Sequence, residues 1–202
     1  MIFNQAKVGC AALFITALFS TSVLAKGNGN NSKAGKKIDT FLVKDVNSRK
    51  CWHIQGGSSA NRTPVWTWDC QANSARFQFK LVPVNKRANI VNGRPTGWFY
   101  MVDRNSGKCL HSRGGGYNDR DPLWLWDCED LMGTEYADRG SFKFVPARAG
   151  SYKIKVRSSG KCMHVRGASL ADRTEIWTWS CLNPAPDHMR FQLLPIRKRD
   201  QL

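Results

Sequence analysis

Six of the eight tryptophans form three Trp-x-Trp pairs, and a histidine precedes each pair at the same distance along the chain. Residues two apart in an extended strand share one face, so the two rings of a pair would lie together. Arg113 and Arg166 follow two of the histidines by two residues, and Gln55 follows the third. Rings beside such donors can pack against flat or sugar-like groups and hold anionic oxygens. The same pattern also fits a structural role, in which the rings cover a core and the histidines fill repeated positions.

Catalytic chemistry has little support in the sequence. It contains no Gly-x-Ser-x-Gly, no His-Glu-x-x-His and no glycine loop followed by Lys-Ser or Lys-Thr. The glycine run at residues 114–116 lacks the flanking strand and helix of a phosphate-binding loop. Asp69 and Asp127 recur in two repeats only and alternate to the strand face opposite the tryptophans. We therefore predict that the protein is not an enzyme and has no cofactor and no metal site.

The seventh cysteine has a separate explanation. Cys10 lies in an apolar run at residues 8–19, which is preceded by Lys7 and followed by small residues up to Ala25. This pattern is typical of a secretory signal peptide over residues 1–25; an uncleaved membrane anchor is the alternative. Export would place the other six cysteines in an oxidising compartment, which favours disulfides over metal binding. We predict a secreted or periplasmic protein without a transmembrane segment.

The other six cysteines form three equal frames, in each of which the two cysteines are separated by 19 positions. Every frame has a lysine before its first cysteine, a Trp-x-Trp before its second, and a closing segment that begins with phenylalanine. The frames contain Cys51 and Cys70, Cys109 and Cys128, and Cys162 and Cys181. Matched flanks at equal spacing indicate a threefold internal repeat. The repeat favours pairing within each frame, although pairing between repeats is also open.

The local pattern predicts strands. Short β-branched and aromatic segments occur at residues 40–43, 98–102 and 152–156 and at the three Trp-x-Trp pairs. Each repeat has room for about four strands, so roughly twelve strands in three lobes fit residues 38–197. We predict loops at residues 85–89 and 92–95, where the spacing between repeats is longest. A flexible basic tail is expected at residues 26–37, and a short C-terminal tail at 198–202.

Residues 38–197 resemble the ricin-type β-trefoil lectins, or ricin B-chain-like domains. The resemblance rests on the three cysteine frames, the tryptophan two residues before each second cysteine, and the aromatic residue that closes each repeat. It implies an all-β fold, a β-trefoil of three repeats with one disulfide inside each repeat. It also implies a shallow sugar pocket in each lobe, in which the stacking aromatic residues would be Trp68, Trp126 and Trp179.

The polar contacts of that family are replaced in every lobe. The position of the sugar-binding aspartate is taken by His53, His111 and His164. A glutamine of the family is replaced by Trp66, Trp124 and Trp177, and an asparagine by Ser74, Arg139 and His188. These changes remove acceptors and add donors and positive charge, so we expect an acidic glycan rather than neutral galactose. The predicted carbohydrate-binding residues are His53, Trp66, Trp68, His111, Arg113, Trp124, Trp126, His164, Arg166, Trp177 and Trp179.

The second lobe is the first choice for an active pocket. It has the longest segment between its second cysteine and its closing phenylalanine, at residues 129–141. The glycine run at residues 114–116 lies in the same repeat. We expect these two segments to form the walls of a pocket.

Two other functions fit the sequence. The chain is similar in size and aromatic content to the cell-binding subunits of cytolethal distending toxins, so it could bind cells for a separate enzyme subunit. The formal net charge of +16 also fits a general polyanion binder without a sugar site, which would bind nucleic acid only without specificity. The last four residues, 199–202, resemble an endoplasmic-reticulum retrieval signal, but a charged tail without such a role is the favoured interpretation.

Overall fold

The computed structural model describes residues 38–197. The predicted signal peptide, basic tail and C-terminal tail lie outside the described residues, so they remain predictions. No helix among the described residues is long and apolar enough to cross a membrane.

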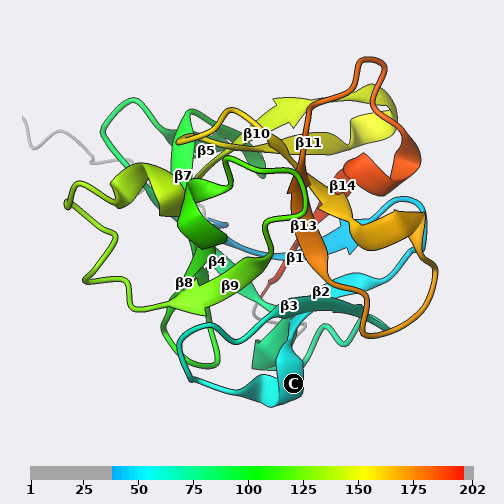
Figure 1. Ribbon diagram of the computed structural model, residues 1–202, viewed down its shortest axis with the longest axis horizontal. Coiled ribbons are helices and arrows are strands. Elements are labelled where there is room, and N and C mark those ends of the chain that lie inside the picture. Colours follow the sequence, from blue (N-terminus) through cyan, green and yellow to red (C-terminus); the bar gives the residue numbers. More distant parts are fainter. Residues whose placement is uncertain (1–37, 198–202) are drawn as a thin grey trace, which may run out of the picture. The chain divides into compact units, whose positions relative to one another are not determined.

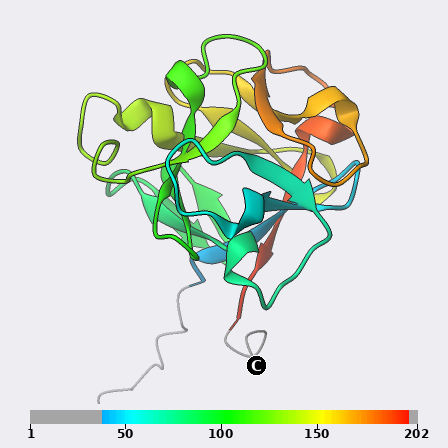
Figure 2. The ribbon, with the colours of Figure 1, turned by 60° about the horizontal axis from the view of Figure 1, so that its bottom comes forward.

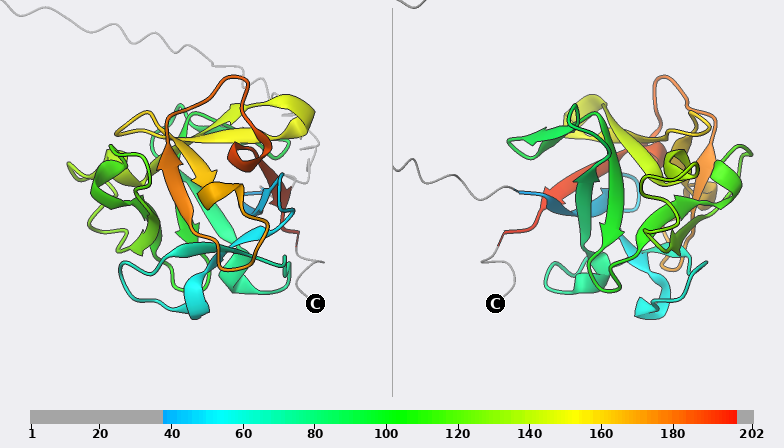
Figure 3. Two further views of the ribbon diagram at one scale, coloured as in Figure 1. Left: turned by 45° about the vertical axis from the view of Figure 1, so that its right-hand side comes forward. Right: turned by 90° about the vertical axis from the view of Figure 1, so that its left-hand side faces the viewer.

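Six strands form a closed barrel in which each strand pairs with two neighbours. They pair antiparallel in the cyclic order β1, β4, β7, β10, β11 and β14, and β14 closes the ring by pairing with β1. Figure 3 shows β1 in blue and β14 in red side by side. The strands are β1 (Thr40–Asp45), β4 (Phe79–Pro83), β7 (Trp98–Asp103), β10 (Ser141–Pro146), β11 (Tyr152–Val156) and β14 (Phe191–Pro195). The expected strands at 40–43, 98–102 and 152–156 are therefore confirmed.

Three hairpins cap one end of this barrel. They are β2 (Cys51–Ile54) with β3 (Val65–Trp68), β8 (Cys109–Ser112) with β9 (Leu123–Trp126), and β12 (Cys162–Val165) with β13 (Ile176–Trp179). Their second strands meet around a triangle through the bridges Pro64–Trp124, Pro122–Trp177 and Trp66–Glu175. Figure 1 shows β3, β9 and β13 around this centre. We call β1–β4 lobe 1, β7–β10 lobe 2 and β11–β14 lobe 3.

Short 3₁₀ helices connect these strands. They are η1 (Gln55–Gly57), η2 (Ala75–Phe77), η3 (Arg113–Gly115), η4 (Ala137–Gly140), η5 (Arg148–Gly150), η6 (Arg166–Ala168) and η7 (Asp187–Met189). Helices η1, η3 and η6 directly follow the first strand of each hairpin, and η2, η4 and η7 precede the closing strand of each lobe. The loops of the three lobes therefore follow one plan, and Figure 2 shows them around the capped end.

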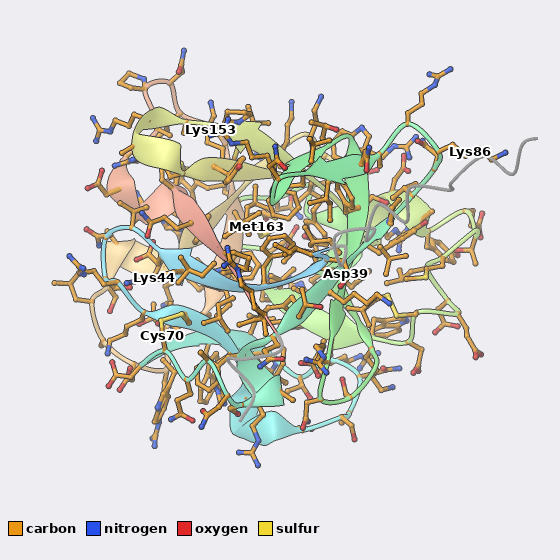
Figure 4. All side chains as sticks on the ribbon, turned by 180° about the vertical axis from the view of Figure 1, so that it is seen from behind. Asp39, Lys44, Cys70, Lys86, Lys153 and Met163 are labelled. Carbon is orange, nitrogen blue, oxygen red and sulfur yellow. A yellow bond between two sulfur atoms is a disulfide. The ribbon has the colours of Figure 1, made fainter. Side chains whose placement is uncertain are left out.

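The core fills the barrel and the space beneath the hairpins. Alternate residues of every barrel strand point inward, as the twofold periodicity of a strand requires. Trp52 is fully buried and contacts Phe191 and Phe79 edge-to-face, with ring centroids 5.1 Å and 6.4 Å apart. Figure 4 shows the buried Met163 among the packed side chains at the centre. This packing holds the hairpins at fixed angles to the barrel.

The disulfides join the two cysteines of each frame. The bonds are Cys51–Cys70, Cys109–Cys128 and Cys162–Cys181, so the predicted pairing within repeats is confirmed. Each bond ties the first strand of a hairpin to the residues that follow its second strand. The base of every hairpin is thus covalently closed.

One prediction was wrong in part. Of the loops expected at residues 85–89 and 92–95, residues 85–88 and 92–93 do lie outside strands, but the remaining residues belong to a separate two-stranded hairpin, β5 (Asn89–Val91) and β6 (Arg94–Thr96). Its turn is Asn92-Gly93, with φ of 50° and 75°. Two consecutive positive φ angles are what a tight hairpin turn needs, and Asn-Gly adopts them at low cost. The extra residues between lobes 1 and 2 therefore form an ordered insertion.

Candidate functional site

Each lobe places an arginine on a tryptophan of the next lobe. The guanidinium carbon lies 5.4–5.8 Å from the ring centroid in the pairs Arg62–Trp126, Arg120–Trp179 and Arg173–Trp68. All three arginines have a positive φ, between 59° and 73°, which costs about 1 kcal/mol or more for a residue with a Cβ atom. Each backbone N–H donates to a carbonyl of the neighbouring hairpin at 2.8–2.9 Å, which helps to offset that cost.

The residue before each arginine contacts a lysine of the same neighbouring lobe. Asp172 lies 2.7 Å from the Lys50 ammonium, and Asp119 lies 2.6 Å from that of Lys161. In the remaining lobe Asn61 takes this place, and its amide oxygen accepts from Lys108 at 2.8 Å. We call these three dipeptides the interlobe braces: Asn61–Arg62, Asp119–Arg120 and Asp172–Arg173.

The braces partly cover the aromatic surface that the sequence predicts to be open. Trp68, Trp126 and Trp179 are only partly exposed, and each ring contacts the arginine of a brace. Each also lies against the histidine of its own lobe, with ring centroids 5.4–5.9 Å apart. Each of these rings therefore lies between an arginine and a histidine, and only part of it is open to solvent.

The three repeated histidines are buried. His53, His111 and His164 are 8–9% exposed, and the Nδ1 atom of each is buried without a hydrogen-bond partner among the described residues. Burial lowers the pKa of His111 to about 4, and the nearby Arg139 adds to this effect. Burial, with His188 beside it, likewise lowers the pKa of His164 to about 4. Burial also lowers the pKa of His53. These histidines are therefore neutral at pH 7 and add no positive charge.

The first tryptophan of each pair has a different environment in each lobe. Arg113 lies over Trp124 at 6.0 Å and Arg166 lies over Trp177 at 5.1 Å. The Trp177 indole N–H donates to Glu175 at 3.0 Å. In lobe 1 the Trp66 indole nitrogen is buried without a partner among the described residues. The sequence repeat therefore does not produce three identical surfaces.

A pocket of about 690 Å³ lies in lobe 2. It brings together four of the predicted residues, namely His111, Arg113, Trp124 and Trp126. Its walls include Gly114 and the segment from Glu129 to Arg139, together with Arg62 of the first brace. Segment 129–141 was expected as a wall from its length, and the glycine run at residues 114–116, of which Gly114 lines the pocket, was expected as the other wall. The predicted residues of lobes 1 and 3 lie on their own hairpins and do not line this pocket.

The long wall segment is held by local contacts. Leu131 is buried and packs with Cys109 and Tyr100, and the Thr134 hydroxyl donates to the Asp130 carbonyl at 2.8 Å. Gly140 allows the chain to pass close by, because a Cβ atom there would lie 2.9 Å from the Leu131 side chain. The pocket is therefore largely preformed by packing.

Sequence reasoning missed the acidic and phenolic side chains of the pocket. Glu129, Asp130, Glu135 and Tyr136 all line it. Asp130 accepts from the Trp126 indole N–H at 2.9 Å and so fixes the orientation of that ring. The carboxylates supply the acceptors that the histidines do not, while three guanidiniums face the same space. The sequence signal was present in the acidic residues of 129–141, but their direction depends on the fold of that segment.

Rings, carboxylates and guanidiniums around one pocket are the groups that hold sugars, since rings pack on C–H faces and the polar groups bind hydroxyls. The sequence matches the family described as ricin-type beta-trefoil lectin domain-like over residues 30–126 and 91–179. The chain belongs to this family. Ricin-type lectin domains are usually non-catalytic carbohydrate-binding modules, and the predicted family is confirmed. No curated protein matches the sequence of this lectin domain.

Solved structures show the same fold. The designed threefold-symmetric protein ThreeFoil is 21% identical, with 77% of this chain and 97% of that chain covered and a TM-score of 0.65. A chain of the cytolethal distending toxin from Actinobacillus actinomycetemcomitans is 16% identical, with 78% and 92% covered and a TM-score of 0.57. The C-half of the earthworm R-type lectin, solved in complex with GalNAc, is 9% identical, with 78% and 98% covered and a TM-score of 0.53. These likenesses confirm that this lectin domain is an all-β β-trefoil.

Proposed function

We propose that this lectin domain binds a glycan in the pocket of lobe 2. The observation that carries the proposal is the meeting of Trp124, Trp126 and Tyr136 with three carboxylates and three guanidiniums around about 690 Å³. That volume suits one or two sugar units, because pockets for small molecules measure roughly 300–1,000 Å³. Tyr136 is 42% exposed, so part of its ring is open to a ligand.

An acidic sugar is the proposed ligand class. Arg139 stands where related lectins have an asparagine, and its guanidinium stacks on Tyr136 at 4.4 Å. Neither Arg139 nor Arg62 forms an ion pair with a carboxylate within residues 38–197, whereas Arg113 lies 3.6 Å from the buried Asp121. The two unpaired guanidiniums supply a site for a carboxylate or sulfate of the sugar. Glu129 and Glu135 would accept from its hydroxyls.

A glycan array with neutral, sialylated, sulfated and phosphorylated glycans tests this proposal. We expect acidic glycans to bind, and Trp124→Ala to weaken that binding by about ten- to a hundredfold, which is roughly 1.4–2.8 kcal/mol. Arg139→Gln should weaken acidic glycans more than neutral ones. The matched control is Trp177→Ala, which changes the equivalent ring in lobe 3 and should leave the lobe 2 pocket intact.

Two outcomes of the same array would contradict the proposal. Binding to neutral galactosides alone would overturn the acidic ligand. Loss of binding in Trp177→Ala together with full binding in Trp124→Ala would place the site in lobe 3 and not in lobe 2. Circular dichroism of each variant shows that the fold is retained.

A second candidate function is the binding subunit of a toxin or similar secreted complex. The likeness to a chain of a cytolethal distending toxin over 92% of that chain supports it. The three disulfides fit an extracellular or periplasmic location, and secretion through the predicted signal peptide is part of this proposal. If an exported enzyme is encoded next to this chain, co-expression of the two should give a stable complex in gel filtration. Separate elution of the two proteins would count against this role.

A further inference from the structure

The outer wall of the barrel carries a row of cations across three strands. Lys143 on β10 lies directly opposite Lys155 on β11, and its other cross-strand partner is Trp98 on β7. Lys153 lies two residues before Lys155 on the same face of β11. Arg157 follows at the end of β11, with its guanidinium 5.9 Å from the Trp98 ring. We call Trp98, Lys143, Lys153, Lys155 and Arg157 the barrel-wall patch.

The threefold repeat supplies an internal comparison for this patch. The cross-strand pair Lys143–Lys155 has an equivalent pair at each of the other two junctions between lobes. These pairs are Lys44–Gln192 and Lys80–Val102, and each contains only one cation. The residues equivalent to Lys153 are Leu42 and Tyr100, both of which are buried. The concentration of charge is therefore a property of this face and not a consequence of the repeat.

Carboxylates do not neutralise the three lysines. Within residues 38–197, Lys143, Lys153 and Lys155 form no ion pair, whereas Arg157 lies 3.1 Å from Asp138. Like charges directly opposite each other in a sheet destabilise it. Cross-strand neighbours lie about 5 Å apart, and residues two apart along a strand about 7 Å. This arrangement fits a ligand that carries several anionic groups in a row.

The inserted hairpin and the loop before it carry further cations. Strand β6 lies against β10 of the patch. Lys86, Arg87 and Arg94 belong to this insertion, and all three are exposed and without an ion pair among the described residues. Figure 4 shows Lys153 on the ribbon of β11 and Lys86 on the loop before β5, at opposite sides of the view.

The aromatic contacts favour a sulfated polysaccharide over single-stranded nucleic acid. Single-stranded nucleic acid binds through bases stacked on open rings. Trp98 is the tryptophan of the patch, and it already contacts Lys143 and Arg157, both at 5.9 Å. The patch also has no strongly exposed large apolar side chain, which a membrane surface would favour. The patch would therefore hold its ligand by charge, and the closely spaced sulfates of a polysaccharide match its closely spaced cations.

We propose that the barrel-wall patch binds a sulfated polysaccharide, independently of the pocket in lobe 2. The pocket lies on the hairpins that cap the barrel, and the patch lies on the outward faces of β7, β10 and β11. The chain then carries two binding surfaces of different chemistry. One holds a sugar by shape and hydrogen bonds, and the other holds a polymer by charge.

Titration with a size-defined heparin fragment at several salt concentrations tests this inference. We expect Lys143→Gln/Lys155→Gln to weaken binding at least tenfold at low salt and to reduce the dependence of log Kd on log salt concentration by about one to two units. The matched control is Lys44→Gln/Lys80→Gln, which removes the same charge from the two equivalent positions and should change Kd less than about threefold. The pocket variant Trp124→Ala keeps the whole barrel-wall patch, so its log Kd should keep the wild-type dependence on log salt concentration.

Three results would overturn the inference. Equal losses in both double variants would show that binding follows net charge and not this face. Equal or tighter binding of single-stranded DNA, or of vesicles that contain phosphatidylserine, would show another class of partner. Loss of the salt-dependent binding in Trp124→Ala, with wild-type binding in Lys143→Gln/Lys155→Gln, would assign the polymer to the pocket. Thermal unfolding of every variant confirms that each one is folded.

Discussion

Lowering the pH from 7 to 4 should reduce the free energy of unfolding by several kcal/mol through two histidines. Burial holds the pKa of His111 and of His164 near 4, whereas the ordinary value is 6.5. Well above pH 6.5 both residues are neutral in the folded and the unfolded chain, so they make no difference to stability. Between pH 6.5 and 4 the unfolded chain takes up protons that the folded chain does not, and folding loses stability. Each histidine contributes roughly 3 kcal/mol to the loss, which is complete below pH 4.

Urea unfolding at pH 7, 5.5 and 4 measures this effect. The variant His111→Gln/His164→Gln has no imidazole at either position, so its stability should fall much less over this range. Burial raises the pKa of Asp45 and Asp103, which acts in the opposite direction as the pH falls, and both residues are present in either protein. The comparison therefore isolates the histidines. An equal fall in the wild-type chain and the double variant would contradict the prediction.

Removing the disulfide of lobe 2 should cost about 3 kcal/mol and also weaken glycan binding. The bond closes a loop between residues separated by 19 positions, and a loop of about this length contributes roughly 3 kcal/mol in the chain-entropy model. Cys109 is fully buried and packs in one cluster with Leu131, which supports the wall of the pocket. Cys109→Ser/Cys128→Ser should therefore loosen that wall as well as destabilise the fold.

The matched control is Cys51→Ser/Cys70→Ser, which opens the equivalent loop in lobe 1. It should lower the free energy of unfolding by a similar amount while glycan affinity at a permissive temperature stays near the wild-type value. Urea unfolding and glycan titration measure the two quantities. If both variants lose glycan binding equally, the effect comes from global stability and not from the pocket wall.

The fold was predictable because the sequence pattern of each structural element occurs three times in the chain. Equal cysteine spacing and matched flanks defined the lobes, and the Trp-x-Trp segments proved to be β3, β9 and β13. The inserted hairpin was missed, although Asn92-Gly93 is a strong turn signal. The short strands around it include Pro95 and exposed polar residues, so they lack the alternation that identifies a half-buried strand.

The site was predictable in part. The length of segment 129–141 indicated which lobe would have a pocket, and His111, Arg113, Trp124 and Trp126 do line it. The covering of the tryptophans was missed because it depends on contacts between lobes. A signal existed in the recurring arginines Arg62, Arg120 and Arg173, but the sequence did not show that each one lies on the tryptophan of the next lobe.

The interlobe braces have a direction. Lobe 1 reaches lobe 2 through Arg62, lobe 2 reaches lobe 3 through Arg120, and lobe 3 returns to lobe 1 through Arg173. Every lobe thus both donates a brace and receives one, and the ring closes only when three lobes are present. A fragment of two lobes would keep a single brace and leave one donor and one acceptor without a partner. In this cycle each lobe stabilises the next one. Duplicating or deleting a single lobe would therefore leave the ring open.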